Sequence, residues 1–189
     1  MFAGNIGAAQ DFETIIAAAC KLKSYKNIHW IIVGEGRMRE WAETEVISLG
    51  LSNNFHFLGR HPLEMMPKFF SLADALLVTL KNEPIFSLTI PAKIQSYLAC
   101  GRPIIAALDG EGARVINDAE AGFTCQTESP DALAQIVLKM YETSKFDRES
   151  MGAKGRAYYE THFDRDMLLN KLERWMKELV ENRLEHNRK

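Results

Sequence analysis

A lysine and two hydroxyl side chains lie near the predicted start of a short helix, where an anion could bind. Pro91 suits the first turn of a helix and Gly101 suits its end, so the residues between them are predicted to form one compact helix. The first-turn amides would carry partial positive charge, and Thr89, Lys93 and Ser96 lie beside them. These groups could bind a diphosphate and a ribose, although such a lysine could also be an ordinary surface residue.

Glycine-containing segments follow two of the predicted strands. Gly4-Asn5-Ile6-Gly7 comes after the first strand and precedes a helix that begins near Gln10 or Asp11. Glycine lets a backbone approach a phosphate closely, but a plain tight turn would need the same residues. Gly34-Glu35-Gly36 follows the second strand, and Arg39 stands where a dinucleotide-binding fingerprint has its third glycine. This second segment is therefore predicted to be a turn and gives no support to NAD binding.

The elements that must position these loops alternate along the chain. Short apolar runs predict strands at 28–33, 55–58, 75–78 and 103–107, and segments with helical periodicity lie at 12–22 and 38–49. This alternation predicts an α/β domain with a doubly wound parallel sheet, flanked by helices. In such folds ligands bind outside the carboxyl ends of the strands, so the loops that follow the strands are expected to form the site.

The carboxyl-terminal part of the sequence changes character at Pro130, after which no strand is predicted. Residues 1–189 are expected to form one domain, of which 130–189 are mostly helical. The last helix carries an apolar stripe made of Leu168, Leu172, Trp175, Leu179 and Val180. We expect this stripe to be buried, either on the sheet of this domain or on a neighbouring part of a longer chain. The first strand, 1–3, is short, which suggests a start at a domain boundary, with a natural start as the alternative.

Composition narrows the class of protein. The sequence is 47% hydrophobic and 25% charged, which is typical of a folded globular protein. Lys and Arg total 23 against 25 Asp and Glu, so a nucleic-acid partner is not expected. Cys20, Cys100 and Cys125 are too widely spaced to predict a disulfide framework or a metal site, and a reducing cytoplasm is expected. No signal peptide is expected from this sequence, and no apolar run approaches the roughly 20 residues of a membrane helix.

The order of the motifs resembles the C-terminal domain of family 4 glycosyltransferases over about the whole chain. The matching segments are Gly4-Asn5-Ile6-Gly7, Val33-Gly34-Glu35-Gly36, Phe57-Leu58-Gly59-Arg60, Ala73-Asp74, the stretch 91–103 and Ala121-Gly122-Phe123. The subgroup that builds bacterial surface polysaccharides is the most similar. The resemblance implies the Rossmann-like, donor-binding half of a GT-B fold. It also implies retaining glycosyl transfer without a metal or cofactor, from a nucleoside-diphosphate sugar that is commonly linked to UDP.

The same resemblance implies roles for individual residues. Residues implied to bind the donor are Gly4, Asn5, Gly7, Gly36, Arg60, His61, Thr89, Ile90, Pro91, Lys93 and Ser96. Among them the first loop would face the diphosphate, Arg60 and His61 would lie beside the base, and residues 89–93 would hold phosphate and sugar. The family often has two Glu residues where this chain has Leu88 and Ser96, which leaves the Ser96 hydroxyl as a substitute for ribose binding.

The first loop also departs from the family pattern. Many relatives place an Arg and a Lys around this loop, where this chain has Asn5 and Gln10, so Lys93 becomes the best remaining cation. No catalytic residue can be named. The acceptor is expected in a separate N-terminal domain, and membrane contact is expected only through that domain or a lipid-linked acceptor. The chain alone is expected to bind a nucleotide but to turn over little or nothing.

Other motifs in the sequence, and other functions, compete with this interpretation. Asp164-Arg165-Asp166 matches a metal-diphosphate motif of a different glycosyltransferase fold, but its place at a helix start predicts capping instead. His29 and His56 fall in predicted strands and are expected to be structural. A sugar-nucleotide epimerase or phosphorylase of GT-B architecture, a non-catalytic nucleotide-binding or regulatory module, and a scaffold that uses the last helix remain alternatives.

Overall fold

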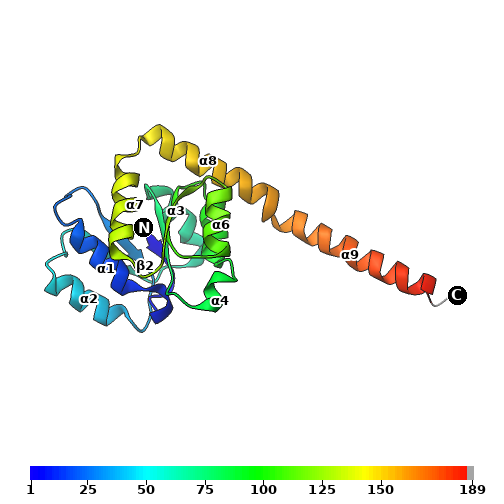
Figure 1. The fold of residues 1–189 in the computed structure, drawn as a ribbon, viewed down its shortest axis with the longest axis horizontal. Helices are drawn as coiled ribbons and strands as arrows, with labels where there is room; N and C mark the ends of the chain where they lie inside the picture. Colours follow the sequence, from blue (N-terminus) through cyan, green and yellow to red (C-terminus); the bar gives the residue numbers. More distant parts are fainter. Residues whose placement is uncertain (187–189) are drawn as a thin grey trace.

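Six short parallel strands form the centre of the protein, which a computed structural model describes for residues 1–186 (Figure 1). The strands are β1 (Phe2–Ala3), β2 (Trp30–Val33), β3 (Phe55–Gly59), β4 (Leu76–Thr79), β5 (Ile104–Ala107) and β6 (Gly122–Cys125). They form two three-stranded sheets in the orders β1-β2-β3 and β4-β5-β6. The Leu77 amide of β4 donates to the Met1 carbonyl at 2.7 Å, which sets β4 beside β1. The combined order is therefore β3-β2-β1-β4-β5-β6, and its direction reverses between β1 and β4.

Helices cover both faces of this sheet. The helices are α1 (Phe12–Lys21), α2 (Arg39–Ser48), α3 (Met66–Leu72), α4 (Pro84–Ser87), α5 (Ala92–Ala99), α6 (Glu111–Asp118), α7 (Pro130–Glu142), α8 (Lys145–His162) and α9 (Arg165–His186), with short 3-10 turns at Ala8–Gln10 and Leu63–Met65. One apolar cluster joins α1, α2 and α7 to one sheet face. A second cluster joins α3, α5 and α6 to the other face. The predicted doubly wound α/β class is confirmed.

Alternating burial explains why the strands are continuous apolar runs. Phe2 and Ile32 point to the first cluster, whereas Ala3 and Val33, the residues that follow them, point to the second. All four residues of β4 and of β5 are buried, because both faces of these central strands are covered. The strands predicted at 28–33, 55–58, 75–78 and 103–107 all correspond to observed strands. Strand β6 was not predicted, and its residues are only half buried.

The position of the last helix contradicts one of the two expectations for where its apolar stripe is buried. From Pro130 to His186 the described residues form α7, α8 and α9, and α9 projects away from the domain (Figure 1). Leu172, Trp175 and Leu179 are 50%, 49% and 69% exposed. Burial of the stripe on the sheet of this domain is therefore wrong, because α9 continues outward from the end of α8 and does not return to the sheet (Figure 1). Burial on a neighbouring part of a longer chain stays a prediction.

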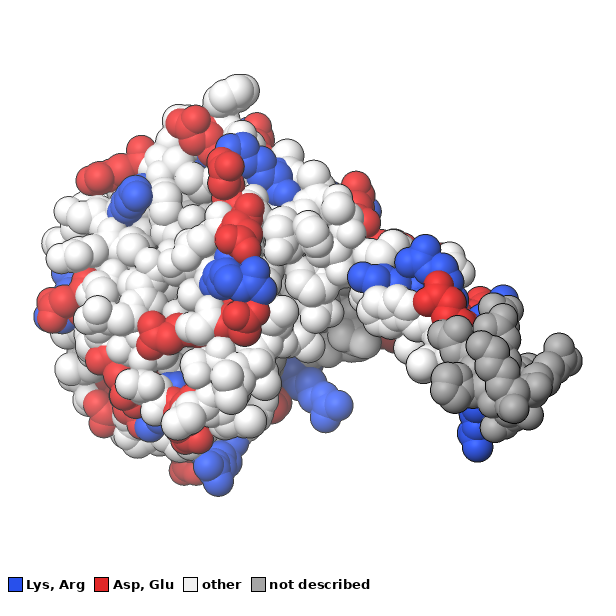
Figure 2. Space-filling view, turned by 45° about the vertical axis from the view of Figure 1, so that its right-hand side comes forward, with Lys and Arg blue, Asp and Glu red and all other residues white. Residues whose placement is uncertain are grey.

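Charged groups of both signs are mixed on the face that Figure 2 presents. Ion pairs on α6 join Arg114 to Glu111 and to Asp118. The electrostatics of a site must therefore be argued from individual groups rather than from a broad patch of one sign.

Across residues 1–186, no helix combines the length and the hydropathy needed to cross a membrane.

Candidate functional site

The loops that follow β1, β2 and β3 are held together at one edge of the sheet. The Gly4 amide donates to the Val33 carbonyl at 2.9 Å, and the Gly34 amide donates to the Gly59 carbonyl at 2.8 Å. The Ile6 amide continues the same pattern with the Glu35 carbonyl at 2.8 Å. These carboxyl ends flank the point between β1 and β4 where the strand order reverses, which is where open α/β sheets bind ligands.

The first two loops approach each other so closely that one of them requires glycine. A Cβ atom on Gly36 would lie 2.3 Å from the carbonyl oxygen of Ile6 and 2.6 Å from the side-chain oxygen of Asn5. No side chain tolerates contacts this short, so a residue other than glycine would push the loops apart. Gly36 thus allows the loop after β2 to pack directly against Asn5 and Ile6 of the Gly4 loop.

The Gly4 loop has fewer free amides than its sequence suggests. The amides of Gly4 and Ile6 donate to the neighbouring loop, and the Gly7 amide donates to the Gln10 side chain at 3.2 Å. Within the described part of the chain, the Asn5 amide has no acceptor, and the first two amides of the following 3-10 turn are likewise unpaired. Asn5 is exposed, so an anion could reach these donors.

Lys93 of α5 extends to this same loop. Its Nζ lies 3.8 Å from the centroid of the Phe2 ring and 3.3 Å from the position that a Cβ would take on Gly4. The Nζ is buried and has no hydrogen-bond acceptor among the described residues. Burial lowers the pKa of Lys93 from 10.5 to about 7. The structure therefore brings the helix that begins after Pro91 together with the Gly4 loop.

Tyr97 fixes α5 on β1 and was not identified from the sequence. Its hydroxyl accepts from the Ala3 amide at 3.0 Å and donates to the Ala3 carbonyl at 3.3 Å. Tyr97 is 1% exposed, and burial raises the pKa of its hydroxyl. Because it stands four residues after Lys93, both side chains lie on the same face of α5. This spacing was the available signal, since a tyrosine at i+4 shares the helical surface of Lys93.

Asp11 fixes the other helix that faces the site. It lies in the left-handed region with φ +47°, is 3% exposed, and its Oδ1 accepts from the Thr14 amide at 3.4 Å as the N-cap of α1. Its Oδ2 is buried and has no partner within residues 1–186. Burial raises the pKa of this carboxyl group. The predicted helix start near Gln10 or Asp11 pointed to the cap but not to its burial.

Arg60 and His61 follow β3 at the same edge. Arg60 is exposed and forms no ion pair with a described residue. The His61 Nε2 lies 3.1 Å from the Leu58 carbonyl oxygen, and its ring centroid lies 4.6 Å from that of Phe69. Because Gly59 is bonded to Gly34, this pair of residues stands on the far side of the glycine loops from β4.

The other residues predicted to bind the nucleotide-sugar donor lie in or just before the first turns of α5. The Thr89 hydroxyl donates to the Ile85 carbonyl at 3.2 Å, and the Ser96 hydroxyl donates to the Ala92 carbonyl at 3.4 Å. Both hydroxyls are exposed and bonded only to nearby backbone, so they could exchange these bonds for a ligand. Ile90 is half buried against the core. It positions the chain rather than offering a polar contact.

The other motifs have structural roles. The Asp164 side chain accepts from the Met167 amide at 2.9 Å, which confirms the predicted cap at the start of α9. The His29 Nδ1 and His56 Nε2 lie 3.2 Å apart. His56 lies in β3 as predicted, whereas His29 lies directly before β2 and outside the strand. The part of the chain that the structure describes contains no cluster of three potential metal ligands.

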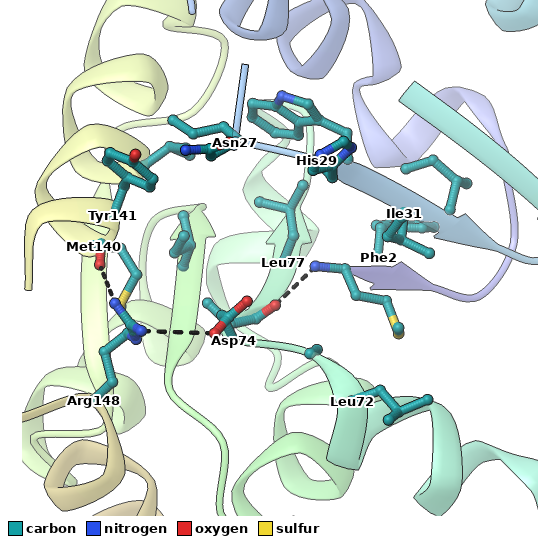
Figure 3. Close-up of a pocket in the computed structure, with 18 residues that line it drawn as sticks. Phe2, Asn27, His29, Ile31, Leu72, Asp74, Leu77, Met140, Tyr141 and Arg148 are labelled. Atoms are coloured by element: carbon teal, nitrogen blue, oxygen red, sulfur yellow. Dashed lines mark hydrogen bonds and ion pairs between the residues drawn. The ribbon is translucent and has the colours of Figure 1, made fainter. Parts of the chain in front are cut away.

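A cavity of about 520 Å³ lies at the opposite edge, beside the amino ends of β1, β2 and β4 (Figure 3). Its walls are mostly apolar, with Asp74 and Arg148 paired at 3.6 Å on one side. Neither Lys93 nor the Gly4 loop lines it. We place the candidate site at the carboxyl edge despite this cavity, because the unpaired amides and the unpaired ammonium group are found there.

Comparisons with known proteins agree with this fold. The chain is 29% identical over 174 residues to the probable glycosyltransferase WbjE of Pseudomonas aeruginosa, a match that covers 90% of this chain and 42% of WbjE. The crystal structure of Anabaena Alr3699/HepE in complex with UDP aligns with a TM-score of 0.78 at 18% identity, over 94% of this chain and 48% of HepE. The C-terminal domain of the glycosyl transferase group 1 family protein LpcC from Francisella tularensis aligns with a TM-score of 0.69 at 21% identity, over 87% of this chain and 86% of that domain.

These matches show how much of each relative the chain covers and which family it belongs to. It spans less than half the length of WbjE and of HepE, but most of the LpcC domain. The family model described as "Glycosyl transferases group 1" matches residues 1–158. The resemblance inferred from the motifs is thereby confirmed, and the chain belongs to the glycosyl transferases group 1 family.

Proposed function

We propose that this chain is the donor-binding domain of a glycosyltransferase and that it binds a nucleoside-diphosphate sugar at the carboxyl edge of the sheet. The observation that carries the proposal is the buried Lys93 ammonium group, which lies beside Gly4 without an acceptor among the described residues. A buried cation without a partner is costly, and a diphosphate would supply the missing acceptor oxygens. The complex of HepE with UDP supports a uridine nucleotide as the donor's leaving group.

The proposed contacts follow from which donors are free. The Asn5 amide and the first amides of the following 3-10 turn face one side of the diphosphate, and the first-turn amides of α5 with Lys93 face the other. Thr89 and Ser96 offer hydroxyls for the sugar or the ribose, and Arg60 and His61 flank the base. During transfer, the same positive groups would stabilise the charge that develops on the departing diphosphate.

The wider activity follows from this role in the proposal. We propose retaining transfer without a metal or cofactor, in polysaccharide or glycoconjugate synthesis in the cytoplasm. In the longer relatives the remaining length would hold the acceptor and any contact with a membrane or a lipid-linked acceptor. The chain by itself would then bind the donor and transfer little or no sugar.

Calorimetric titration with UDP, GDP and ADP tests the proposal. We expect UDP to bind the wild type and Lys93→Met to weaken that binding at least tenfold, since a charged hydrogen bond to phosphate is lost. Lys139→Met is a matched control, because the Lys139 Nζ also lies over a phenylalanine ring, Phe123, at 4.0 Å, but near the amino end of β6. The absence of binding to any of the three nucleotides by the folded wild type would refute the proposal.

A further inference from the structure

Among residues whose side chains the structure describes, no group near Lys93 could balance its charge. Residues 1–7, which include β1 and the Gly4 loop, carry no ionisable side chain, and the Met1 amino group donates to the Ala75 carbonyl, before the start of β4. Tyr97 of α5 and Cys100, which follows α5, are the next ionisable groups, and burial raises the pKa of both, which keeps them neutral. Strand β4, which α5 also contacts, has no charged residue.

Charged groups on the other elements around α5 are engaged elsewhere. Glu111 and Arg114 pair with each other on α6, Lys154 of α8 pairs with Glu120, Arg156 of α8 pairs with Glu160, Lys81 after β4 pairs with Glu13, and Glu35 in the loop after β2 pairs with Arg39. Lys93 therefore packs on the Phe2 ring with neither an anion nor a hydrogen-bond acceptor among the described residues.

A diphosphate at the Gly4 loop would change this environment. In the free protein the ammonium form is disfavoured, since burial removes its hydration and only the contact with the Phe2 ring partly replaces it. A bound diphosphate would place negative oxygens within reach of the Nζ, and an anion at this distance favours the charged form. The same nitrogen would then be neutral in a fraction of free molecules and charged in the complex.

We infer that binding of a nucleoside-diphosphate sugar at this site brings a proton onto Lys93, so that the domain takes up a proton together with its donor. This inference rests on the proposed function and adds a regulation to it. Donor affinity is independent of pH where Lys93 is already charged in the free protein, and it falls as the pH rises above neutrality. A more alkaline pH thus favours release of the nucleotide.

The size of the effect follows from linkage between proton and ligand binding. With a pKa of about 7 in the free protein, Lys93 is mostly neutral at pH 8. Proton uptake on binding is then about 0.9 at pH 8 and about 0.1 at pH 6, and affinity falls about tenfold for each pH unit above 7. A histidine that loses its proton on binding would give the opposite dependence, with an affinity that rises with pH.

Calorimetry in pairs of buffers that differ in ionisation enthalpy measures this uptake directly. The probe is UDP-glucose, because its diphosphate is esterified at both ends and does not titrate near neutrality, whereas the terminal phosphate of UDP does. We expect uptake of about 0.9 at pH 8 and about 0.1 at pH 6 for the wild type and for Lys139→Met. Lys93→Arg, which keeps the charge, and Lys93→Met, which removes it, should bind without uptake.

The outcomes separate this inference from the proposed function. Binding of UDP-glucose to the wild type without proton uptake at pH 8 overturns the inference and leaves the proposed function standing. Uptake that persists unchanged in both Lys93 variants also overturns it, because another group would then titrate. If the folded wild type binds neither UDP-glucose nor any of UDP, GDP and ADP at either pH, the proposed function itself is overturned.

Discussion

Replacing Lys93 with methionine should make the free protein more stable while it weakens donor binding. The pKa of Lys93 falls from 10.5 to about 7 on folding because its ammonium group is buried without a partner. Between these values the unfolded chain binds more protons than the folded one, so stability rises with pH across this window. The loss of folding stability caused by burying Lys93 is therefore fully present below pH 7 and disappears above pH 10.5.

The magnitude follows from the same two values. At about 1.36 kcal/mol for each pH unit, the difference between 10.5 and about 7 corresponds to an upper limit of about 5 kcal/mol at pH 7. Methionine keeps an unbranched apolar stem over the Phe2 ring and has no charge to desolvate. We expect Lys93→Met to raise the free energy of unfolding at pH 7 by several kcal/mol, less the lost cation–π contact of about 1–2 kcal/mol.

Urea denaturation of wild type, Lys93→Met and Lys139→Met at pH 7 and pH 9.5 provides the assay. The advantage of Lys93→Met should shrink by about 3 kcal/mol between the two pH values, whereas Lys139→Met should show no such change. Equal stability of wild type and Lys93→Met at pH 7, or a difference that does not depend on pH, would refute the burial argument.

Three further substitutions test the supporting structure. Gly36→Ala forces a Cβ against the Ile6 carbonyl oxygen, so it should cost about 1–3 kcal/mol in urea denaturation and weaken UDP binding, and an unchanged affinity would contradict the close packing of the loops. Tyr97→Phe leaves the amide and carbonyl of Ala3 unpaired, so it should lower stability by about 1–3 kcal/mol; a smaller loss would mean that water replaces the hydroxyl. Folding raises the pKa of Asp11, so its ionisation lowers the free energy of unfolding as the pH rises from about 4. The free energy of unfolding of Asp11→Asn should therefore equal or exceed that of the wild type at pH 7, and any advantage should be lost by pH 4.

Most of the fold could be predicted because strands covered on both faces are continuous apolar runs. The segments around Ile32, Leu77 and Ile105 were found in this way. Strand β6 escaped detection because Gly122 and Thr124 interrupt its apolar character and its residues are only half buried. The outward course of α9 could not be predicted, since an apolar stripe indicates burial but does not identify the surface that covers it.

The candidate site was only partly accessible from the sequence. Helix start and stop signals located α5, so Lys93 could be placed near free amides. Its approach to Gly4 depends on how Tyr97 docks α5 on β1, which is a tertiary contact across more than ninety residues. The Gly7 amide is unavailable to a ligand because it donates a hydrogen bond to the Gln10 side chain, and no sequence spacing reveals this bond.

A crystal structure of the chain with UDP tests the central claim most directly. We predict that the diphosphate lies at the carboxyl edge of the sheet, with an oxygen about 3 Å from the Lys93 Nζ and another near the Asn5 amide. A nucleotide seated instead in the cavity beside Asp74 and Arg148, with the Lys93 Nζ still unpaired, would contradict the account.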